Sequence, residues 1–408
     1  KDAQKYLSFF GTGIFVDKGG AALKSISLIG STGSIGRQTC SVVRRHREEF
    51  RIVSLVANTS AELFLRQVEE FRPEFAALID EEAARSVRGK IPAGTRFSSG
   101  IDGGMEALTY GDTAVIAATG FVGLKYTLEA ARLKKNIALA NKETLVCGGE
   151  LVMREISRAG VELMPVDSEH SALWQALGFR LDAPFRRLII TASGGPFYSY
   201  TEEQLKKVTF RDALKHPTWN MGAKITVDSA TLLNKGFEVI EAKWLYGTEL
   251  KKIHTLVQPE SIIHSMVEFD DGGILAQLSY PSMELPIQLA LTYPKRMDCG
   301  LKPLDFESLG ALRFLPLERK RFPCYDLALS AAETGDNYPC ALNAAGEIAV
   351  GAFLKERISF PLIAETIKRT LEKVSRTRIN GYEALAETDA AARRYAAEFI
   401  AGLPAKTE

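Results

Sequence analysis

The sequence of 408 residues has few cysteines and no long apolar run. Its five cysteines are scattered and form no CxxC pair, and they are Cys40, Cys147, Cys299, Cys324 and Cys340. This distribution argues against a thiolate zinc site and fits a reducing compartment, so we expect a cytoplasmic location. No apolar stretch approaches the roughly 18 residues that a membrane-spanning helix needs, so we expect no membrane partner.

An excess of charge of one sign is also missing. The chain carries 51 basic and 50 acidic residues, for a net charge of +1, and it has no long basic run. We therefore expect no nucleic-acid partner. The hydrophobic share of 46% and charged share of 25% are those of a globular protein. The length of 408 residues suggests two or three domains. Residues 1–23 lack the features of a secretion signal or a transit peptide, and we interpret them as an extension or cloning remnant.

Short apolar strands and helices alternate from residue 25 onward. A strand at residues 25–29 runs into a glycine-rich turn at residues 30–36, and a helix follows. Such a turn lets the backbone approach a pyrophosphate, which the helix N-terminus attracts. The spacing is GxxGxxG instead of GxGxxG, so a tight turn in another α/β unit stays open as an alternative. Later strands at residues 51–56, 75–79, 114–118 and 136–140 predict a Rossmann-like, doubly wound parallel sheet.

The second strand ends in Asn58, Thr59 and Ser60. An NAD site usually has an acidic residue there, which binds the ribose 2′-hydroxyl. Its absence leaves small polar side chains that do not repel the 2′-phosphate of NADPH. Because no basic residue stands in this turn, we expect only a modest preference for NADPH over NADH.

Two carboxylates, Asp167 and Glu169, follow a run that is predicted to end a strand. In an extended chain they point to the same side, with Ser168 between them. Close carboxylates repel each other unless a cation neutralises them, and oxygen ligands suit Mg²⁺ or Mn²⁺. The alternative is a solvated acidic loop whose Asp or Ser caps a helix over residues 171–177.

Three further segments carry polar side chains in loops. Residues 141–143 (Asn-Lys-Glu) end a predicted parallel strand, where ligands of such sheets bind, or they cap the following turn. Residues 193–195 (Ser-Gly-Gly) follow a strand at residues 187–190 and suit an oxyanion such as phosphate, or form an ordinary turn. Residues 215–222 combine His216 and Trp219 with Pro and Gly bends. This loop either packs into the core or closes over a ligand as a lid.

A helix is predicted to open with Asp228 or Ser229 as its cap. Its apolar face consists of Leu233, Phe237, Ile240 and Trp244. Asn234, Lys235 and Glu238 fall together on the opposite side. That side is either solvated or a ligand face, which would offer a cation and an amide to a phosphate and a third carboxylate to the metal.

The remaining sequence predicts a second sheet and a helical tail. Strand-like segments at residues 256–258, 261–267 and 274–278 resemble the antiparallel edge of a mixed sheet. A proline-rich linker at residues 293–322 then leads to a C-terminal helical domain at residues 323–408.

Six motifs occur in order: GSTGSIG, LANKE, PVDSEHSA, TASGGPF, KHPTWNMG and VDSATLLNKGFEVIEA. In order and spacing they resemble the 1-deoxy-D-xylulose 5-phosphate reductoisomerase family, from about Ser25 to the C-terminal helices. The resemblance implies a homodimer with an NADPH-binding domain (residues 24–163) and a catalytic and dimerisation domain (residues 164–292). It implies rearrangement and reduction of 1-deoxy-D-xylulose 5-phosphate to 2-C-methyl-D-erythritol 4-phosphate, in non-mevalonate isoprenoid biosynthesis.

Matching positions carry over the family's site residues. The implied metal ligands are Asp167, Glu169 and Glu238. The implied substrate contacts are Lys142, Ser168, Glu169, Ser193, His216, Ser229, Asn234, Lys235 and Glu238. Among these, the implied catalytic residues are Lys142, Glu169, His216 and Glu238. The implied cofactor contacts are Thr32, Gly33, Ser34, Ile35, Asn58, Thr59, Ser60, Asn141, Glu143, Met221 and Gly222. The sequence departs from the family at residues 58–60, where many members have glycine, a basic residue and asparagine.

Two alternatives belong to other classes. One is another NADP-linked oxidoreductase, of the semialdehyde or homoserine dehydrogenase type. That class has no use for the acidic triplet, so strict dependence on Mn²⁺ or Mg²⁺ discriminates against it. The other is a non-catalytic nucleotide-sensing module, in which the carboxylate cluster is dispensable.

Overall fold

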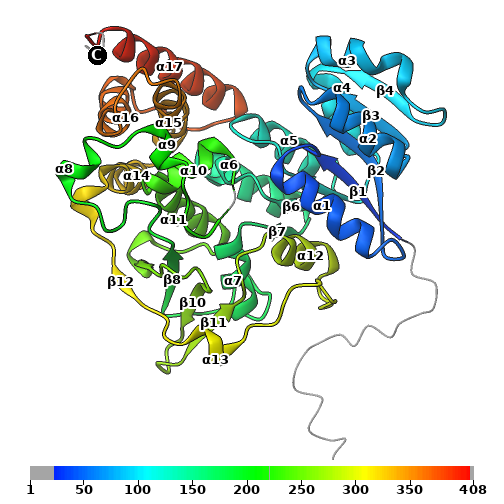
Figure 1. The fold of residues 1–408 in the computed structure, drawn as a ribbon. Coiled ribbons are helices and arrows are strands. Elements are labelled where there is room, and N and C mark those ends of the chain that lie inside the picture. Colours follow the sequence, from blue (N-terminus) through cyan, green and yellow to red (C-terminus); the bar gives the residue numbers. More distant parts are fainter. Residues whose placement is uncertain (1–22, 220, 405–408) are drawn as a thin grey trace, which may run out of the picture.

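The computed structural model describes residues 23–219 and 221–404. Sheet A with its helices, sheet B with its helices, and a C-terminal group of helices follow one another along the chain (Figure 1). The extension predicted for residues 1–23 lies outside the described residues, apart from Leu23. Among the described helices, none is long and apolar enough to cross a membrane.

Sheet A has seven parallel strands in the order β4-β3-β2-β1-β5-β6-β7. Its strands are β1 (Lys24–Ile29), β2 (Phe50–Ala57), β3 (Phe75–Leu78), β4 (Arg96–Ser99), β5 (Thr113–Ile116), β6 (Asn136–Leu139) and β7 (Leu163–Pro165). The predicted doubly wound parallel sheet is confirmed. The strand order reverses between β1 and β5, and ligands of such sheets bind beyond the strand ends at that switch point.

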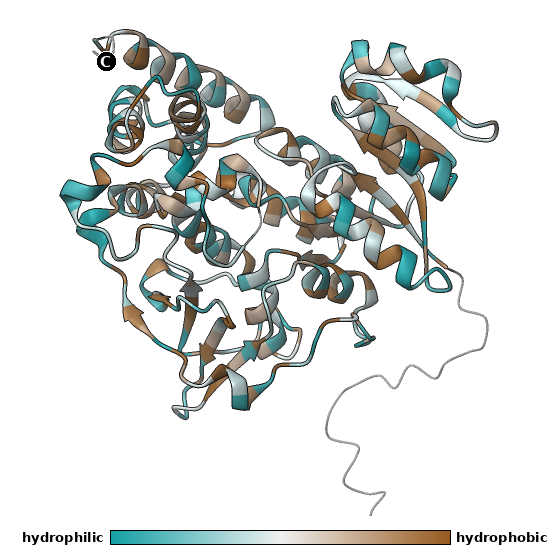
Figure 2. Cartoon of the chain, viewed as in Figure 1, coloured by the Kyte–Doolittle hydropathy of each residue, from teal (hydrophilic) through white to brown (hydrophobic). Residues whose placement is uncertain are grey.

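Helices on both faces of sheet A bury its strands. They are α1 (Ser34–Arg45), α2 (Ala61–Phe71), α3 (Glu81–Val87), α4 (Gly100–Glu106), α5 (Val122–Arg132) and α6 (Lys142–Ala159), with short 3₁₀ turns η1 (Arg88–Lys90) and η2 (Ala107–Thr109). Ile26 and Leu28 of β1 are fully buried. Burial on both faces explains why these strands are near-continuous apolar runs, which Figure 2 shows between helices with hydrophilic outer faces.

Sheet B is mixed, with the strand order β11-β10-β8-β9-β12. Its strands are β8 (Arg187–Ala192), β9 (Ile253–Val257), β10 (Ile263–Glu268), β11 (Ile274–Leu278) and β12 (Leu315–Pro316). Strands β8 and β9 are parallel, whereas β10 pairs antiparallel with both β8 and β11. The predicted antiparallel edge is confirmed for β10 and β11, whereas the first predicted segment overlaps β9, which is parallel to β8. The segment predicted as a linker contributes β12, which pairs with β9.

The helices around sheet B supply much of the predicted site. They are α7 (Ser168–Ala176), α8 (Glu202–Leu205), α9 (Phe210–Ala213), α10 (Ala223–Ala230), α11 (Leu233–Leu245), α12 (Glu284–Thr292) and α13 (Phe306–Leu309), with the 3₁₀ turns η3 (Leu250–Lys252) and η4 (Arg319–Arg321). Two predicted helix starts are wrong. Helix α7 begins at Ser168 instead of residue 171. Asp228 and Ser229 lie inside α10, and α11 starts only after Leu232, whose φ of 59° turns the chain between the two helices.

The C-terminal helices are α14 (Pro323–Thr334), α15 (Tyr338–Leu354), α16 (Pro361–Lys373) and α17 (Tyr382–Ala401), which confirms the predicted helical tail. Three of them have proline in the first turn, where its missing N–H is not needed. Helix α15 packs against α6, and α11 packs between α6 and α14. One apolar core therefore extends from sheet A into the C-terminal helices.

Candidate active site

Three carboxylates converge between α7 and α11. Asp167 stands at the N-cap of α7, Glu169 lies in its first turn, and Glu238 comes from α11. Each offers an oxygen atom, and these atoms lie within 4.8 Å of one another. Asp167 is 8% exposed and Glu238 is 1% exposed, so a solvated acidic loop is excluded.

The predicted local geometry of Asp167 and Glu169 is wrong. Asp167 and Glu169 do not lie on one extended strand, because the helix starts between them at Ser168. The Asp167 carboxylate makes no capping hydrogen bond, which leaves it free to face the other two acids. Of the two alternatives for the polar side of α11, the solvated face is excluded, since Lys235 and Glu238 are both almost fully buried.

Two lysines border the carboxylates. Lys142 Nζ, from the start of α6, lies 2.6 Å from Asp167 Oδ2 and 3.3 Å from Glu238 Oε1. Lys235 Nζ lies 2.8 Å from Glu169 Oε1, contacts Glu238 Oε2, and donates to the Thr191 carbonyl at 2.6 Å. Asn234 also donates to Glu238. When all three carboxylates are ionised, the two ammonium groups leave one negative charge, which favours a further cation.

Burial and neighbouring charges both shift the pKa values of these groups. Burial, reinforced by the charge of Glu169, raises the pKa of Glu238. Burial alone would also raise the pKa of Asp167, but the Lys142 ammonium outweighs it and holds that pKa below its usual range. Burial would lower the pKa of Lys142, yet Asp167 and Glu238 raise it. A buried site of charged, mutually dependent groups results, which is typical of a functional centre.

The Ser-Gly-Gly turn after β8 faces the end of α10. Gly194 and Gly195 have φ angles of 82° and 65°, a conformation that suits glycine. A Cβ on Gly195 would lie 2.9 Å from the backbone oxygen of Ser229, so the two segments approach closely. Ser193 Oγ accepts the Gly195 amide at 3.1 Å. The bond between Lys235 and Thr191 brings a cation beside this turn.

His216 is fixed in one tautomer by its neighbours. Its Nδ1 accepts the amides of Thr218 at 3.3 Å and Trp219 at 3.0 Å, so the proton resides on Nε2. Nε2 lies 3.0 Å from Ser193 Oγ and donates to it. Burial lowers the pKa of His216 to about 4, which agrees with a neutral ring.

The segment at residues 215–222, here called the flap, lies against sheet B; Asn220 is outside the described residues. Thr218 Oγ1 is 3.0 Å from Ser261 Oγ. The Trp219 ring meets the His264 ring edge-on, with centroids 6.0 Å apart. Trp219 is half-buried, so it lies at the surface of the described structure and not in the core.

The glycine-rich turn lies at the switch point of sheet A. Gly30 has a φ of 91°, and a Cβ there would lie 2.6 Å from the backbone of Ala117, just after β5. Thr32, Gly33, Ser34 and Ile35 remain at least partly open to solvent around the N-terminus of α1. The turn bonds back to β2, through the amides of Gly30 and Ser31 on Val56. Exposed Asn58, Thr59 and Ser60 follow on from that strand.

Residues 141–143 have different roles: one caps a helix, and another reaches the carboxylate cluster. Asn141 caps α6, since its Oδ1 accepts the Thr144 amide at 2.9 Å, as the capping alternative predicted. Lys142 reaches the carboxylates instead. Glu143 accepts the Gly120 amide at 3.2 Å and the Asn141 side-chain amide at 2.9 Å, and it pairs with Lys224. Met221 and Gly222 directly precede α10, which carries that lysine.

A buried pair that the sequence did not reveal supports the carboxylates. His170 Nε2 lies 3.1 Å from Glu241 Oε2, and both side chains are fully buried. Tyr246 donates its hydroxyl to the His170 carbonyl at 2.6 Å. Glu241 comes three residues after Glu238, on neighbouring positions of α11. Helical spacing from Glu238 was the signal that could have found it.

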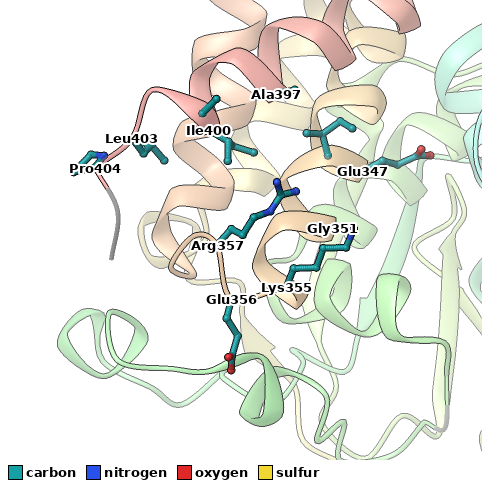
Figure 3. A pocket seen from close by; sticks show the side chains of 11 residues that line it. Glu347, Gly351, Lys355, Glu356, Arg357, Ala397, Ile400, Leu403 and Pro404 are labelled. Carbon is teal, nitrogen blue, oxygen red and sulfur yellow. The ribbon is translucent and has the colours of Figure 1, made fainter. Parts of the chain in front are cut away.

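A cavity of about 520 Å³ lies elsewhere, between α15 and α17. Lys355, Arg357 and Glu347 line it together with apolar residues of α17 (Figure 3). None of the predicted site residues lines it. A second cavity, of about 260 Å³, touches the site only at Gly194.

Comparison with known proteins matches the chain to one family. Residues 26–149 match the 1-deoxy-D-xylulose 5-phosphate reductoisomerase model. Residues 163–246 and 278–395 match the models of that enzyme's C-terminal domains. The chain is 45% identical, over 92% of its length and 97% of the relative, to the 1-deoxy-D-xylulose 5-phosphate reductoisomerase of Bacteroides thetaiotaomicron. It belongs to the 1-deoxy-D-xylulose 5-phosphate reductoisomerase family.

Other reductoisomerases agree in sequence and structure. The enzyme of Caldanaerobacter subterraneus subsp. tengcongensis is 49% identical, over 86% of this chain and 92% of the relative. The solved reductoisomerase of Zymomonas mobilis in complex with NADPH superposes with a TM-score of 0.88 at 36% identity, covering 94% of this chain and 100% of that one. A reductoisomerase with NADPH, fosmidomycin and magnesium gives 0.87 at 36% identity, covering 93% and 98%. The chain is therefore an NADPH-dependent oxidoreductase of the reductoisomerase family, and the dehydrogenase and nucleotide-sensor alternatives are rejected.

Proposed function

We propose that the carboxylate cluster is the centre at which this reductoisomerase converts 1-deoxy-D-xylulose 5-phosphate to 2-C-methyl-D-erythritol 4-phosphate. The reaction depends on NADPH and a divalent metal, and it belongs to non-mevalonate isoprenoid biosynthesis. One observation carries the assignment: Asp167, Glu169 and Glu238 converge from two helices, beside two buried lysines.

The three carboxylates would hold the metal. They offer oxygen ligands only, which fits Mg²⁺ or Mn²⁺ and disfavours softer ions. When bound, the metal acts as a Lewis acid on the substrate carbonyl and its neighbouring hydroxyl. Lys142 Nζ and Ser168 Oγ would donate hydrogen bonds to the substrate oxygens on which negative charge builds up. Glu169 and Glu238 would accept hydrogen bonds from the substrate hydroxyls.

The phosphate subsite would consist of Ser193, Ser229, Asn234 and Lys235. The Ser-Gly-Gly turn and the Lys235 ammonium suit a dianion. His216 Nε2–H donates to Ser193 Oγ, so that the serine hydrogen is free to face the phosphate. Anchoring the phosphate fixes the pose for both chemical steps. Flap closure would keep water from the reactive aldehyde that precedes reduction.

NADPH would bind beyond the carboxyl ends of the strands of sheet A and supply the hydride. Thr32, Gly33, Ser34 and Ile35 would contact the pyrophosphate from the N-terminus of α1. Asn58, Thr59 and Ser60 would face the adenosine end. Asn141, Glu143, Met221 and Gly222 would contact the part of the cofactor that lies nearest the substrate.

We also propose a homodimer in the cytoplasm, built on sheet B. Strand β11 is one of the two edge strands of this sheet, and Ile274 and Leu275 are 51% and 54% exposed. Neighbouring residues of a strand point to opposite faces, so this edge is apolar on both. An uncovered apolar edge favours pairing with another chain.

The proposed domain division assigns residues 24–163 to NADPH binding, 164–292 to catalysis and dimerisation, 293–322 to a linker and 323–408 to the helical domain.

The decisive test follows NADPH oxidation with 1-deoxy-D-xylulose 5-phosphate, with and without a chelator. We expect turnover to stop with the chelator and to return on addition of Mg²⁺ or Mn²⁺, with the methylerythritol phosphate identified by mass spectrometry. Turnover that is unchanged by the chelator would contradict the proposed role of the carboxylate cluster in metal binding. Absence of turnover by the folded, metal-loaded enzyme would contradict the proposed function.

A further inference from the structure

Lys224 occupies a position that disfavours a positive charge. It lies in the first turn of α10, where the ammonium adds to the positive end of the helix dipole. Its Nζ lies 3.0 Å from Asp228 Oδ2, one turn further along, and 3.4 Å from Glu143 Oε1 on α6. The ammonium is also 5.5 Å from the centre of the Phe237 ring. These partners, and not the helix, stabilise the charge.

Lys224 compensates the buried charge of Glu143. Glu143 is 8% exposed, and each of its carboxylate oxygens has a fixed partner. Oε1 accepts the Gly120 amide at 3.2 Å, and Oε2 accepts the Asn141 amide at 2.9 Å. Burial acts to raise the pKa of Glu143, but Lys224 and the amide donors outweigh it and lower that pKa. A buried carboxylate that loses its cation is strongly disfavoured, so loss of Lys224 should reorient or protonate Glu143.

The same lysine is attached to the end of the flap. It stands two residues after Gly222, which is the N-cap of α10 and accepts the Thr226 amide at 3.1 Å and hydroxyl at 2.8 Å. The first turn of α10 is therefore rigidly joined to Gly222. An ion pair from that turn to α6 sets how far the end of the flap lies from Glu143.

We propose that Lys224 is a positioning residue, which holds the Glu143 carboxylate and the C-terminal end of the flap together so that both meet NADPH. This inference rests on the proposed function, because Glu143 and Gly222 are proposed cofactor contacts. Lys224 acts on the cofactor through these two residues and not by contact with the sugar phosphate. Its removal should therefore affect NADPH and leave the other substrate and the metal largely unaffected.

The first experiment compares single variants in steady-state kinetics. In Lys224→Met we expect KM for NADPH to rise about tenfold, while kcat and KM for the sugar phosphate stay within about twofold. Lys224→Arg keeps the charge and should retain most of the NADPH affinity. Lys243→Met is the matched control, because the Lys243 ammonium has no carboxylate partner within the part of the chain that the structure describes. It donates to the backbone oxygen of Ala332 at 3.1 Å and lies over the Trp244 ring. An unchanged KM for NADPH in Lys224→Met would overturn the proposal.

The second experiment is a double-mutant cycle with Glu143→Gln, read as the dissociation constant of NADPH from protein fluorescence. If Lys224 acts through Glu143, the Lys224→Met/Glu143→Gln enzyme should bind NADPH about as well as Glu143→Gln alone. Independent, multiplying losses would overturn the proposal. If Lys224→Met does not fold, Lys224→Gln against Lys224→Arg decides the same point, and equal affinity in both would overturn it. Because this readout needs no turnover, an enzyme that binds NADPH without converting the sugar phosphate would defeat the proposed function and leave the cycle valid.

Discussion

At the scale of single residues, the site combines buried charges of both signs. Glu238 shows the arrangement best, since Asn234, Lys235 and Lys142 all contact its carboxylate. Removing one member of such a network leaves its partners unbalanced. Substitutions that keep the shape and remove the charge therefore test function more cleanly than truncations.

We predict that Glu238→Gln lowers kcat by about a thousandfold, because the proposed metal loses one anionic ligand. NADPH should still bind, since Glu238 lies away from the glycine-rich turn. The measurement is turnover at saturating metal, together with the dissociation constant of NADPH. Glu268→Gln is the matched control, as this buried carboxylate pairs with Arg187 at the end of β10. Near-normal turnover in Glu238→Gln would show that it is not a ligand.

At the scale of elements, the flap depends on one neutral imidazole. His216 accepts two flap amides at Nδ1 and donates from Nε2 to Ser193, on the turn after β8. Protonation of Nδ1 would remove the acceptor for both amides. We therefore expect a closed form with a neutral ring, and an open form in which the ring titrates with its ordinary pKa.

We predict that the flap opens as the pH falls. The pKa of His216 is about 4 in the closed form, against an ordinary value of 6.5. The open form therefore binds the proton more readily, so the stability of the closed form is fully present above 6.5 and is lost as the pH falls toward 4. Trp219 fluorescence reports the change once Trp174 and Trp244 are replaced by Phe.

The control for this titration is His216→Gln in the same single-tryptophan background. Glutamine does not titrate, so its Trp219 signal should stay flat over that pH range. An identical titration in both proteins would show that another group controls the flap.

At the scale of the whole molecule, sheet A, sheet B and the C-terminal helices share one apolar core. One edge of sheet B nevertheless exposes apolar side chains. Helices α6 and α11 pack on each other and on the C-terminal helices, which holds Lys142 opposite Glu238. By contrast, β11 presents apolar residues to solvent at the edge of the sheet. A second copy of the chain would cover this edge.

We predict that Leu275→Lys converts the proposed dimer to a monomer at micromolar concentration, because it places a charge on the apolar edge. Analytical ultracentrifugation gives the mass in solution. Leu23→Lys is the control, since Leu23 is 44% exposed and lies before sheet A. A monomeric parent enzyme, or an unchanged dimer in Leu275→Lys, would show that β11 is not the interface.

The sequence by itself determined the parallel sheet, the helical tail and the family. Strand and helix periods are local properties, and the glycine-rich turn follows from the conformations that glycine allows. The order and spacing of six motifs were enough to indicate the reductoisomerase family, and that prediction is confirmed. The sequence also identified Asp167, Glu169 and Glu238 as one set, although it gave the wrong local geometry for the first two.

Tertiary structure alone decided which polar side chains are buried and which side chains they contact. The polar side of α11 has the same helical period whether water or Lys142 faces it, so its burial could not be read from the sequence. The pairs of Lys142 with Asp167, His216 with Ser193, and Lys224 with Glu143 join residues that are far apart in the chain. Such encounters depend on how whole helices and sheets pack, because a local pattern fixes the face of an element but not its neighbour.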